Sequence, residues 1–215
     1  MDKLEEDIFF RSEKVPDQEF LRARRGLLEN EEERDLVLGY QGRVRFPVWI
    51  QFSMLGLYDL HKRLEGKKVL DIGCGDNADL VYWLRAHGVD AEGLDPRARD
   101  EPHFMKKTIR LGEGIPRGDN HYDLVLMNSV PTFTSMDDNS NNADYILRLN
   151  YLVSETLRVL KPRCEFRVAP RIPTEGYTLM QTIRGYNGSA REENMTNEEG
   201  APSLFTRTVI TKGKK

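Results

Sequence analysis

Along the chain, short apolar runs typical of strands alternate with segments whose apolar residues recur at helical spacing. Short apolar runs predict strands at 69–72, 89–95, 107–111, 122–128 and 165–169. The run within 122–128 is unbroken from Leu124 to Met127, which is typical of a parallel strand buried on both faces. Apolar residues at helical spacing predict helices over 79–87 and 144–160. Strands that alternate with helices in this way predict an α/β domain with a parallel sheet.

The two ends of the chain follow other patterns. Residues 177–186 and 204–211 alternate and are rich in β-branched side chains, so we expect them to close the sheet as an antiparallel pair. Residues 1–40 are polar with a helical pattern, whereas 41–66 are dense in apolar and aromatic residues. We therefore divide the chain into a helical N-terminal extension, 1–55, and an α/β domain, 56–215.

The strand predicted at 69–72 leads into a glycine turn that predicts a ligand site. Asp71 lies near the end of this strand, and Gly73 and Gly75 follow it. Glycines between a strand and a helix leave room for a ligand to approach the backbone, and the amides at the helix start favour anionic groups. Asp95 ends the next strand, about 20 residues further on, where a carboxylate can accept hydrogen bonds from ribose hydroxyls.

These residues resemble the motif of the class I S-adenosylmethionine-dependent methyltransferases. The family pattern is a hydrophobic strand, an acid, any residue and then Gly-x-Gly-x-Gly. The sequence Val69-Leu70-Asp71-Ile72-Gly73-Cys74-Gly75 matches it, with Asn77 in place of the last glycine. Two further segments, 118–125 and 157–162, resemble the family's entry to its fourth strand and the end of the helix that follows, although Arg163-Cys164 replaces the usual Gly-Gly.

The resemblance implies a doubly wound, mostly parallel sheet of seven strands whose last strand is antiparallel. The usual last helix is not expected, because the stretch 170–176 is short. The implied cofactor is S-adenosylmethionine, bound beyond the carboxyl ends of the strands. The implied cofactor-binding residues are Asp71, Gly73, Cys74 and Gly75 for the methionine part, Asp95 and Pro96 for the ribose, Gly112 and Glu113 beside the adenine, and Asn128. A solvated loop position is the alternative for Glu113.

A nicotinamide-binding Rossmann protein is an alternative interpretation of the same turn. Gly73, Gly75 and Ala78 also satisfy G-x-G-x-x-G/A. Against it, Asp71 would lie unfavourably beside a pyrophosphate, and the chain is short for a dehydrogenase with its own substrate domain. A module that binds the cofactor without turnover is a third alternative.

The methyl acceptor is less well indicated than the cofactor. Asn128 and Ser129 follow the strand at 122–128 and are the candidate catalytic residues. No single base is required, because methyl transfer to a good nucleophile depends mainly on alignment. Phe46, Trp49 and Phe52 are candidate acceptor-binding residues, and a core role is the alternative for them.

Composition and charge limit the remaining possibilities. The 32 basic and 35 acidic residues give a formal net charge of −3, which favours a small-molecule acceptor over a nucleic acid. An RNA or protein acceptor stays open if the arginines at 163, 167, 171, 184 and 191 share a face. The four histidines have no metal-ligand spacing, so no metal is expected. No signal peptide, membrane-length apolar run or disulfide framework is predicted, and we expect a cytoplasmic protein whose oligomeric state is not indicated.

Overall fold

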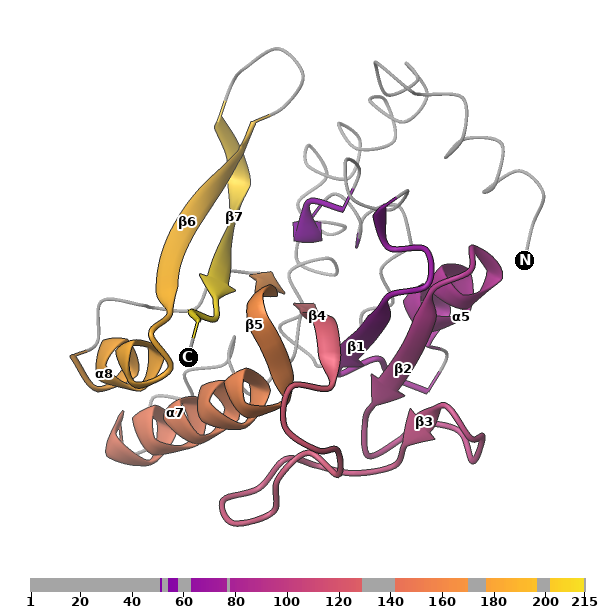
Figure 1. Ribbon diagram of the computed structural model, residues 1–215, viewed down its shortest axis with the longest axis horizontal. Helices are drawn as coiled ribbons and strands as arrows, with labels where there is room; N and C mark the ends of the chain where they lie inside the picture. Colours follow the sequence, from indigo (N-terminus) through magenta and orange to yellow (C-terminus); the bar gives the residue numbers. More distant parts are fainter. Residues whose placement is uncertain are drawn as a thin grey trace, which may run out of the picture.

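Seven strands form one mostly parallel sheet in the computed structural model of the chain (Figure 1). The structure describes residues 51, 54–57, 63–76, 78–128, 142–169, 177–196 and 202–214. The elements are β1 Lys68–Ile72, α5 Asp79–Ala86, β2 Asp90–Leu94, β3 Phe104–Met105, β4 Tyr122–Asn128, α7 Asn142–Val159, β5 Leu160–Ala169, α8 Tyr177–Gly185, β6 Ser189–Thr196 and β7 Pro202–Thr211. The strand order is β3-β2-β1-β4-β5-β7-β6, with β7 antiparallel to both of its neighbours. The predicted fold class is confirmed for the sheet.

The N-terminal extension is a prediction that the structure does not test. Residues 1–50 lie outside the described part of the chain. At the boundary, Leu55 ends a helical segment, and Leu57 is fully buried. The division at residue 55 therefore stays a prediction.

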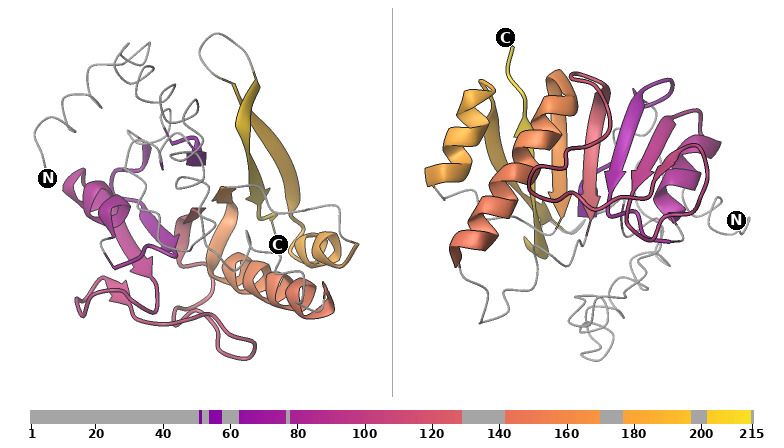
Figure 2. Two further views of the ribbon diagram at one scale, coloured as in Figure 1. Left: turned by 180° about the vertical axis from the view of Figure 1, so that it is seen from behind. Right: turned by 90° about the horizontal axis from the view of Figure 1, so that it is seen from below.

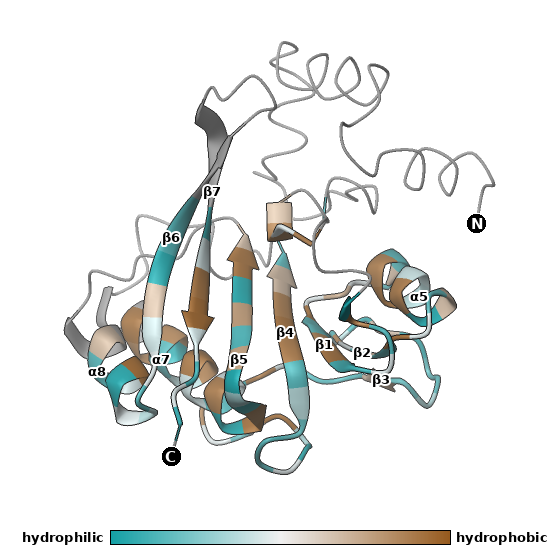
Figure 3. Cartoon of the chain, turned by 45° about the horizontal axis from the view of Figure 1, so that its top comes forward, coloured by the Kyte–Doolittle hydropathy of each residue, from teal (hydrophilic) through white to brown (hydrophobic). Residues whose placement is uncertain are grey.

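Alternate residues of each strand face two separate hydrophobic layers, as the period of two in a strand requires. Leu70 and Ile72 of β1 belong to the layer that contains the buried residues of α7 and Ile183 of α8. Val69 belongs to the other layer, which contains the buried side of α5. Figure 2 shows α7 and α8 together on one face of the sheet. Strand β4 contributes to both layers, and Figure 3 shows it as largely hydrophobic along its length.

Two predicted strands, at 107–111 and 177–186, are wrong. Strand β3 is only two residues long and precedes the run at 107–111, so no periodicity could indicate it. Residues 177–185 form α8 rather than a strand, and a last helix is therefore present. Met180 and Ile183, one helical turn apart, pack on the core there, and tertiary packing outweighs the β propensity of the segment. The strand that pairs with β7 at the edge of the sheet is instead β6, which is largely hydrophilic (Figure 3).

The connections on either side of β3 contain no helix among their described residues, 95–103 and 106–121. Ion pairs hold the second connection instead. Arg117 forms a bidentate pair with Glu92 of β2 at 2.9 Å, and the Tyr122 hydroxyl donates to the same carboxylate. Arg158, near the end of α7, donates to the carbonyls of Ile115 and Arg117. The connection therefore lies fixed between the sheet and α7.

The β6–β7 hairpin extends past the carboxyl end of β5 (Figure 1). Strand β5 pairs with residues 208–211 of β7, whereas β6 pairs with β7 as far as Pro202. At the opposite end of the sheet, the Lys212 ammonium donates to the carbonyl of Leu160 at 2.7 Å and to Asn120 at 2.8 Å. This buried lysine joins the end of β7 to the junction between α7 and β5.

Candidate functional site

The polar residues predicted from the glycine motif meet where the strand order reverses. Strands β2 and β4 flank β1, and the chain leaves β1 for one side of the sheet and returns on the other, so the switch point lies between β1 and β4. Asp71 of β1, Asp95 after β2 and Asn128 at the end of β4 are 3%, 5% and 9% exposed. Ile72 pairs with Met127, which places Asn128 beside the start of the glycine turn.

The glycine turn has a conformation that side chains other than glycine rarely adopt. Gly73 and Gly75 have φ angles of +80° and +72°. The Gly73 amide donates to the Leu94 carbonyl at 2.7 Å, which fixes the turn against β2. A Cβ atom at Gly75 would meet no atom within 4 Å, so the turn presents open space on that side. Backbone is therefore accessible to a ligand at Gly75.

Asp95 holds together the two loops that border this space. Its Oδ2 accepts a hydrogen bond from the Gly75 amide at 3.1 Å, and its Oδ1 accepts one from the Arg97 amide at 2.7 Å. The Arg97 side chain forms an ion pair with Oδ1 at 3.4 Å. A carboxylate has about four acceptor positions. At least one position of Asp95 therefore stays available for a ligand hydroxyl.

Asp71 is a buried carboxyl group without a hydrogen bond from the described residues. Burial and, to a smaller extent, the negative charge of Asp95 together raise the pKa of Asp71 to about 8. The two carboxyl groups thus create a local environment that favours a proton or another cation.

Cys74 fills space that a glycine of the neighbouring strand leaves. A Cβ atom at Gly93 would lie 2.7 Å from the Cys74 sulfur and 2.7 Å from the Phe104 ring. Burial, with the charges of Asp71 and Asp95, raises the pKa of the Cys74 thiol well above its ordinary value. The thiol is therefore protonated and serves as packing rather than as a nucleophile.

Two residues of this site, Gly93 and Arg97, were not among the residues predicted from the sequence. A signal for Gly93 was present, because a glycine inside a strand often marks a close backbone approach. Arg97 was not indicated by any pattern; it follows Pro96, which is exposed beside Asp95. Arg99, two residues later, donates to the Asp76 carbonyl at 3.2 Å and adds a second link between the two loops.

The expected position of Gly112 and Glu113 is wrong. They were expected at the carboxyl end of the third strand, but that strand ends at Met105, and Lys106 and Lys107 follow it. Gly112 and Glu113 lie in an exposed turn of the long connection, closed by a bridge between Arg110 and Glu113. Their role beside an adenine stays a prediction without this geometric support.

Other predicted residues lie outside the described part of the chain, namely Ser129, Phe46, Trp49 and Phe52. Among the described residues, no three His, Cys, Asp or Glu side chains are grouped so that they could hold a metal ion. None of the described helices is long and apolar enough to cross a bilayer.

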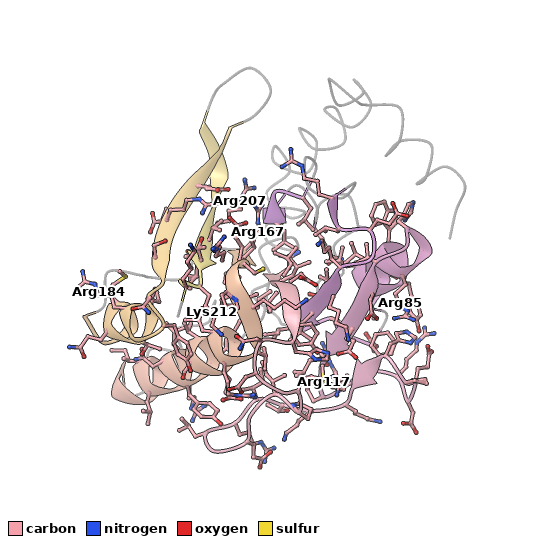
Figure 4. The ribbon with its side chains drawn as sticks, in the orientation of Figure 1. Arg85, Arg117, Arg167, Arg184, Arg207 and Lys212 are labelled. Atoms are coloured by element: carbon pink, nitrogen blue, oxygen red, sulfur yellow. The ribbon has the colours of Figure 1, made fainter. Side chains whose placement is uncertain are left out.

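The described arginines of the predicted basic set do not all lie on one face. Arg163 lies near the amino end of β5, away from the site, and Arg184 lies on α8, apart from Arg167 (Figure 4). Arg167 and Arg191 both form ion pairs with Glu165. Arg171 is outside the described residues. The described members of this set therefore give no support to a nucleic-acid acceptor, which stays an untested alternative.

Comparisons with known proteins agree with the fold. A family model for the methionine biosynthesis protein MetW matches residues 59–137, less than half of the chain. No curated protein sequence matches. The chain is similar to the structure of the PH0226 protein from Pyrococcus horikoshii OT3, with 15% identity, a TM-score of 0.51 and coverage of 86% of this chain and 100% of that one.

A second similar structure is an S-adenosylmethionine-dependent methyltransferase from Archaeoglobus fulgidus. The identity is 14%, the TM-score is 0.50, and the match covers 76% of this chain and 93% of that one. At such identities the similarity concerns the fold. The chain has the fold of the class I methyltransferases, and the resemblance indicated by the motif is confirmed at this level.

Substitution of Gly93 tests the packing behind the glycine turn. We expect Gly93→Ala to lower the free energy of unfolding by about 1–3 kcal/mol, because the added methyl group overpacks against Cys74 and Phe104. Cys74 should then react faster with a thiol reagent. Urea unfolding and thiol labelling measure the two effects. Gly118→Ala is the control, since a Cβ there would meet nothing within 4 Å. Equal behaviour of the two variants would refute the packing role.

Proposed function

We propose that the chain binds S-adenosylmethionine at the carboxyl ends of β1 and β2 and transfers its methyl group to a small-molecule acceptor. The observation that carries this proposal is the pair of buried carboxyl groups, Asp71 and Asp95, on either side of an open glycine turn in a class I methyltransferase fold. We further propose a cytoplasmic location, which the free thiols of Cys74 and Cys164 support.

Asp71 fits the cationic end of this cofactor. A buried carboxylate without a hydrogen bond is costly, and an ammonium group supplies both a donor and the opposite charge. S-adenosylmethionine carries an ammonium group on its methionine part and, when bound, supplies a methyl group already activated by the sulfonium. Asp71 would accept from the ammonium directly or through a water. The burial that raises its pKa in the free protein favours such a partner.

Asp95 fits the ribose of the cofactor. Its carboxylate is already oriented by the amides of Gly75 and Arg97, so little rearrangement is needed when a hydroxyl occupies the remaining acceptor position. Gly73 and Cys74 would contact the methionine part through backbone groups, Pro96 would contact the adenosine part, and Asn128 would lie near the transferred methyl group.

A nicotinamide dinucleotide fits these residues less well. Its pyrophosphate would approach the same turn, where it would repel the Asp95 carboxylate and leave the buried Asp71 without a cationic partner. The preference between the two ligands therefore depends on the charge of the group placed beside Asp71. A cationic group is favoured there and an anionic one is disfavoured.

The acceptor is proposed to be a small molecule, and an RNA or protein acceptor is the second candidate. The net charge of −3 and the ion pairs of Arg167 and Arg191 both argue against a basic binding face. We further propose that residues 1–55 contribute to the acceptor side, with Phe46, Trp49 and Phe52. Alignment of the acceptor would do most of the catalytic work, with Asn128 and Ser129 as candidates to orient it.

Calorimetry with S-adenosylhomocysteine and NAD tests the cofactor. We expect the wild type to bind the first and not the second. Asp95→Ala should weaken binding of S-adenosylhomocysteine by about 1–3 kcal/mol, since a hydrogen bond to the ribose and the hold on Gly75 are both lost. Asp90→Ala, an exposed change at the first residue of β2, should have no effect. Binding of NAD alone would favour the oxidoreductase alternative.

The protonation of Asp71 gives a second test. In the free protein the fold favours protonated Asp71, so its contribution to stability is full below its ordinary pKa of 3.8 and is lost as pH rises through about 8. A cationic ligand favours the ionised form. We therefore expect affinity for S-adenosylhomocysteine to rise with pH up to about 8, with release of a proton on binding.

Asp71→Asn should abolish this proton release, weaken binding and make the free protein more stable above pH 8 than the wild type. Calorimetry in buffers of different ionisation enthalpy counts the protons released, and thermal unfolding measures stability. Affinity that does not change with pH between 5 and 8 would contradict the role of Asp71.

Transfer of a labelled methyl group tests the acceptor. The wild type is incubated with labelled S-adenosylmethionine and separate pools of metabolites, RNA and protein. We expect label in the metabolite pool. Label only in RNA, with affinity that falls steeply as salt rises, would show the second candidate to be right. Tight cofactor binding without label in any pool would favour a module without turnover.

A further inference from the structure

Two arginines from the far half of the sheet meet the chain where it enters the α/β domain. A helical segment ends at Leu55, and Gly56 follows with a φ of +65°, a common geometry after a helix. Arg167 of β5 donates from Nη1 to the Leu55 carbonyl at 3.0 Å and to the Gly56 carbonyl at 2.7 Å. The last carbonyls of a helix lack partners within the helix, and a guanidinium also suits their negative partial charge.

The second arginine lies against the same glycine. A Cβ atom at Gly56 would lie 2.1 Å from Cζ of Arg207, so only glycine permits this contact. Arg207 comes from β7 and is held by Glu193 of β6. Figure 4 shows Arg167 and Arg207 close to each other beside β5 and β7. We call Gly56, Arg167 and Arg207 the entry anchor.

Both arginines of the entry anchor are oriented by carboxylates. Glu165 Oε2 accepts from both Arg167 Nε at 2.9 Å and Arg167 Nη2 at 2.7 Å. Burial works against the ionisation of Glu165, but hydrogen bonds from Arg191 and Arg167 outweigh it and lower the pKa of the carboxyl group. Arg167 is only 7% exposed. A buried ion pair is a weak source of stability, so its fixed geometry is the more informative property.

The segment that the anchor holds belongs to the same hydrophobic layer as the start of α5. Met54, Leu55 and Leu57 are 3% exposed or less and share one hydrophobic layer with Ala78 and Leu80. Ala78 is the residue before α5, a few positions after the glycine turn, and it has a φ of +51°. The same layer includes Ala169 at the carboxyl end of β5. The position of residues 54–57 therefore bears on the start of α5.

We propose that Arg167 and Arg207 are positioning residues of the cofactor site: they fix the helix end at Leu55–Gly56, and the packing of residues 54–57 passes this position to the start of α5, which follows the glycine turn. The inference rests on the proposed binding of S-adenosylmethionine there. It assigns to β5 and β7 a part in a site whose ligand contacts come from β1, β2 and β4.

Arg191 provides a matched control for the experiment. It forms ion pairs with the same two carboxylates, Glu165 at 2.8 Å and Glu193 at 2.9 Å, but its side chain is 48% exposed. Its removal takes away comparable ion pairs and leaves the contacts at Leu55 and Gly56. The variants are Arg167→Gln, Arg207→Gln and Arg191→Gln in the full chain. The probes are S-adenosylhomocysteine affinity, thermal unfolding and hydrogen exchange of the amides of residues 54–57.

We expect Arg167→Gln and Arg207→Gln to weaken S-adenosylhomocysteine binding about tenfold and to speed exchange at residues 54–57. The affinity of Arg191→Gln for S-adenosylhomocysteine should stay within twofold of the wild type, even if its melting temperature falls as much as that of the other two variants. Equal affinity in Arg207→Gln and Arg191→Gln would overturn the proposal. If Arg167→Gln does not fold, the comparison of the other two variants decides.

Failure of the proposed function gives a different result. The wild type would then not bind S-adenosylhomocysteine. Hydrogen exchange at residues 54–57 would still test whether the entry anchor fixes this segment. Faster exchange at residues 54–57 and at the start of α5 in Arg207→Gln alone would support the anchor as a positioning device for whatever ligand the site takes. The same exchange in Arg207→Gln and Arg191→Gln would overturn it.

Discussion

The hydrogen bond from the Gly75 amide to the Asp95 carboxylate is the interaction on which the site depends. It joins the turn after β1 to the loop after β2, and thus fixes the relative position of two segments that leave the sheet side by side. Because this carboxylate is nearly buried, its orientation is set before a ligand arrives. Asp71, two residues before the turn, accepts no hydrogen bond from the described residues, and its burial beside Asp95 raises the pKa of its carboxyl group.

The site could be predicted from the sequence where its determinants are local. Asp71, Gly73 and Gly75 lie within five residues, and the strand at 122–128 is marked by its own composition, so both were found. The two-residue β3 has no period to detect, and β6 is a polar edge strand whose formation depends on its neighbour. The segment at 177–185 has strand-like composition, but its core contacts made it a helix. The contact of Arg167 with the helix end could not be predicted, because the carbonyls of Leu55 and Gly56 lie more than 100 residues away in the sequence.

The described connections around β3 contain no helix, and ion pairs and hydrogen bonds hold the second one against the sheet and α7. A doubly wound sheet normally covers its faces with a helix at each crossover. Here Glu92 within β2 and Glu155 within α7 bind the connection, Glu155 by accepting from the Ile115 amide at 3.0 Å and by pairing with Arg158. Hydrogen bonds from arginines thus do the work that apolar helix faces do elsewhere in the domain. This part of the protein should be more sensitive to salt than the α7 side of the core.

The polar character of β6 has a consequence for the protein at high concentration. An outermost strand carries a row of unpaired backbone groups that can recruit a strand from another molecule. Strand β6 occupies this place with Arg191, Glu192 and Glu193 in succession. A second molecule that paired along it would have to bring these charges into register with its own. The same residues that made the strand hard to recognise in the sequence therefore disfavour pairing of this edge with a strand of another molecule.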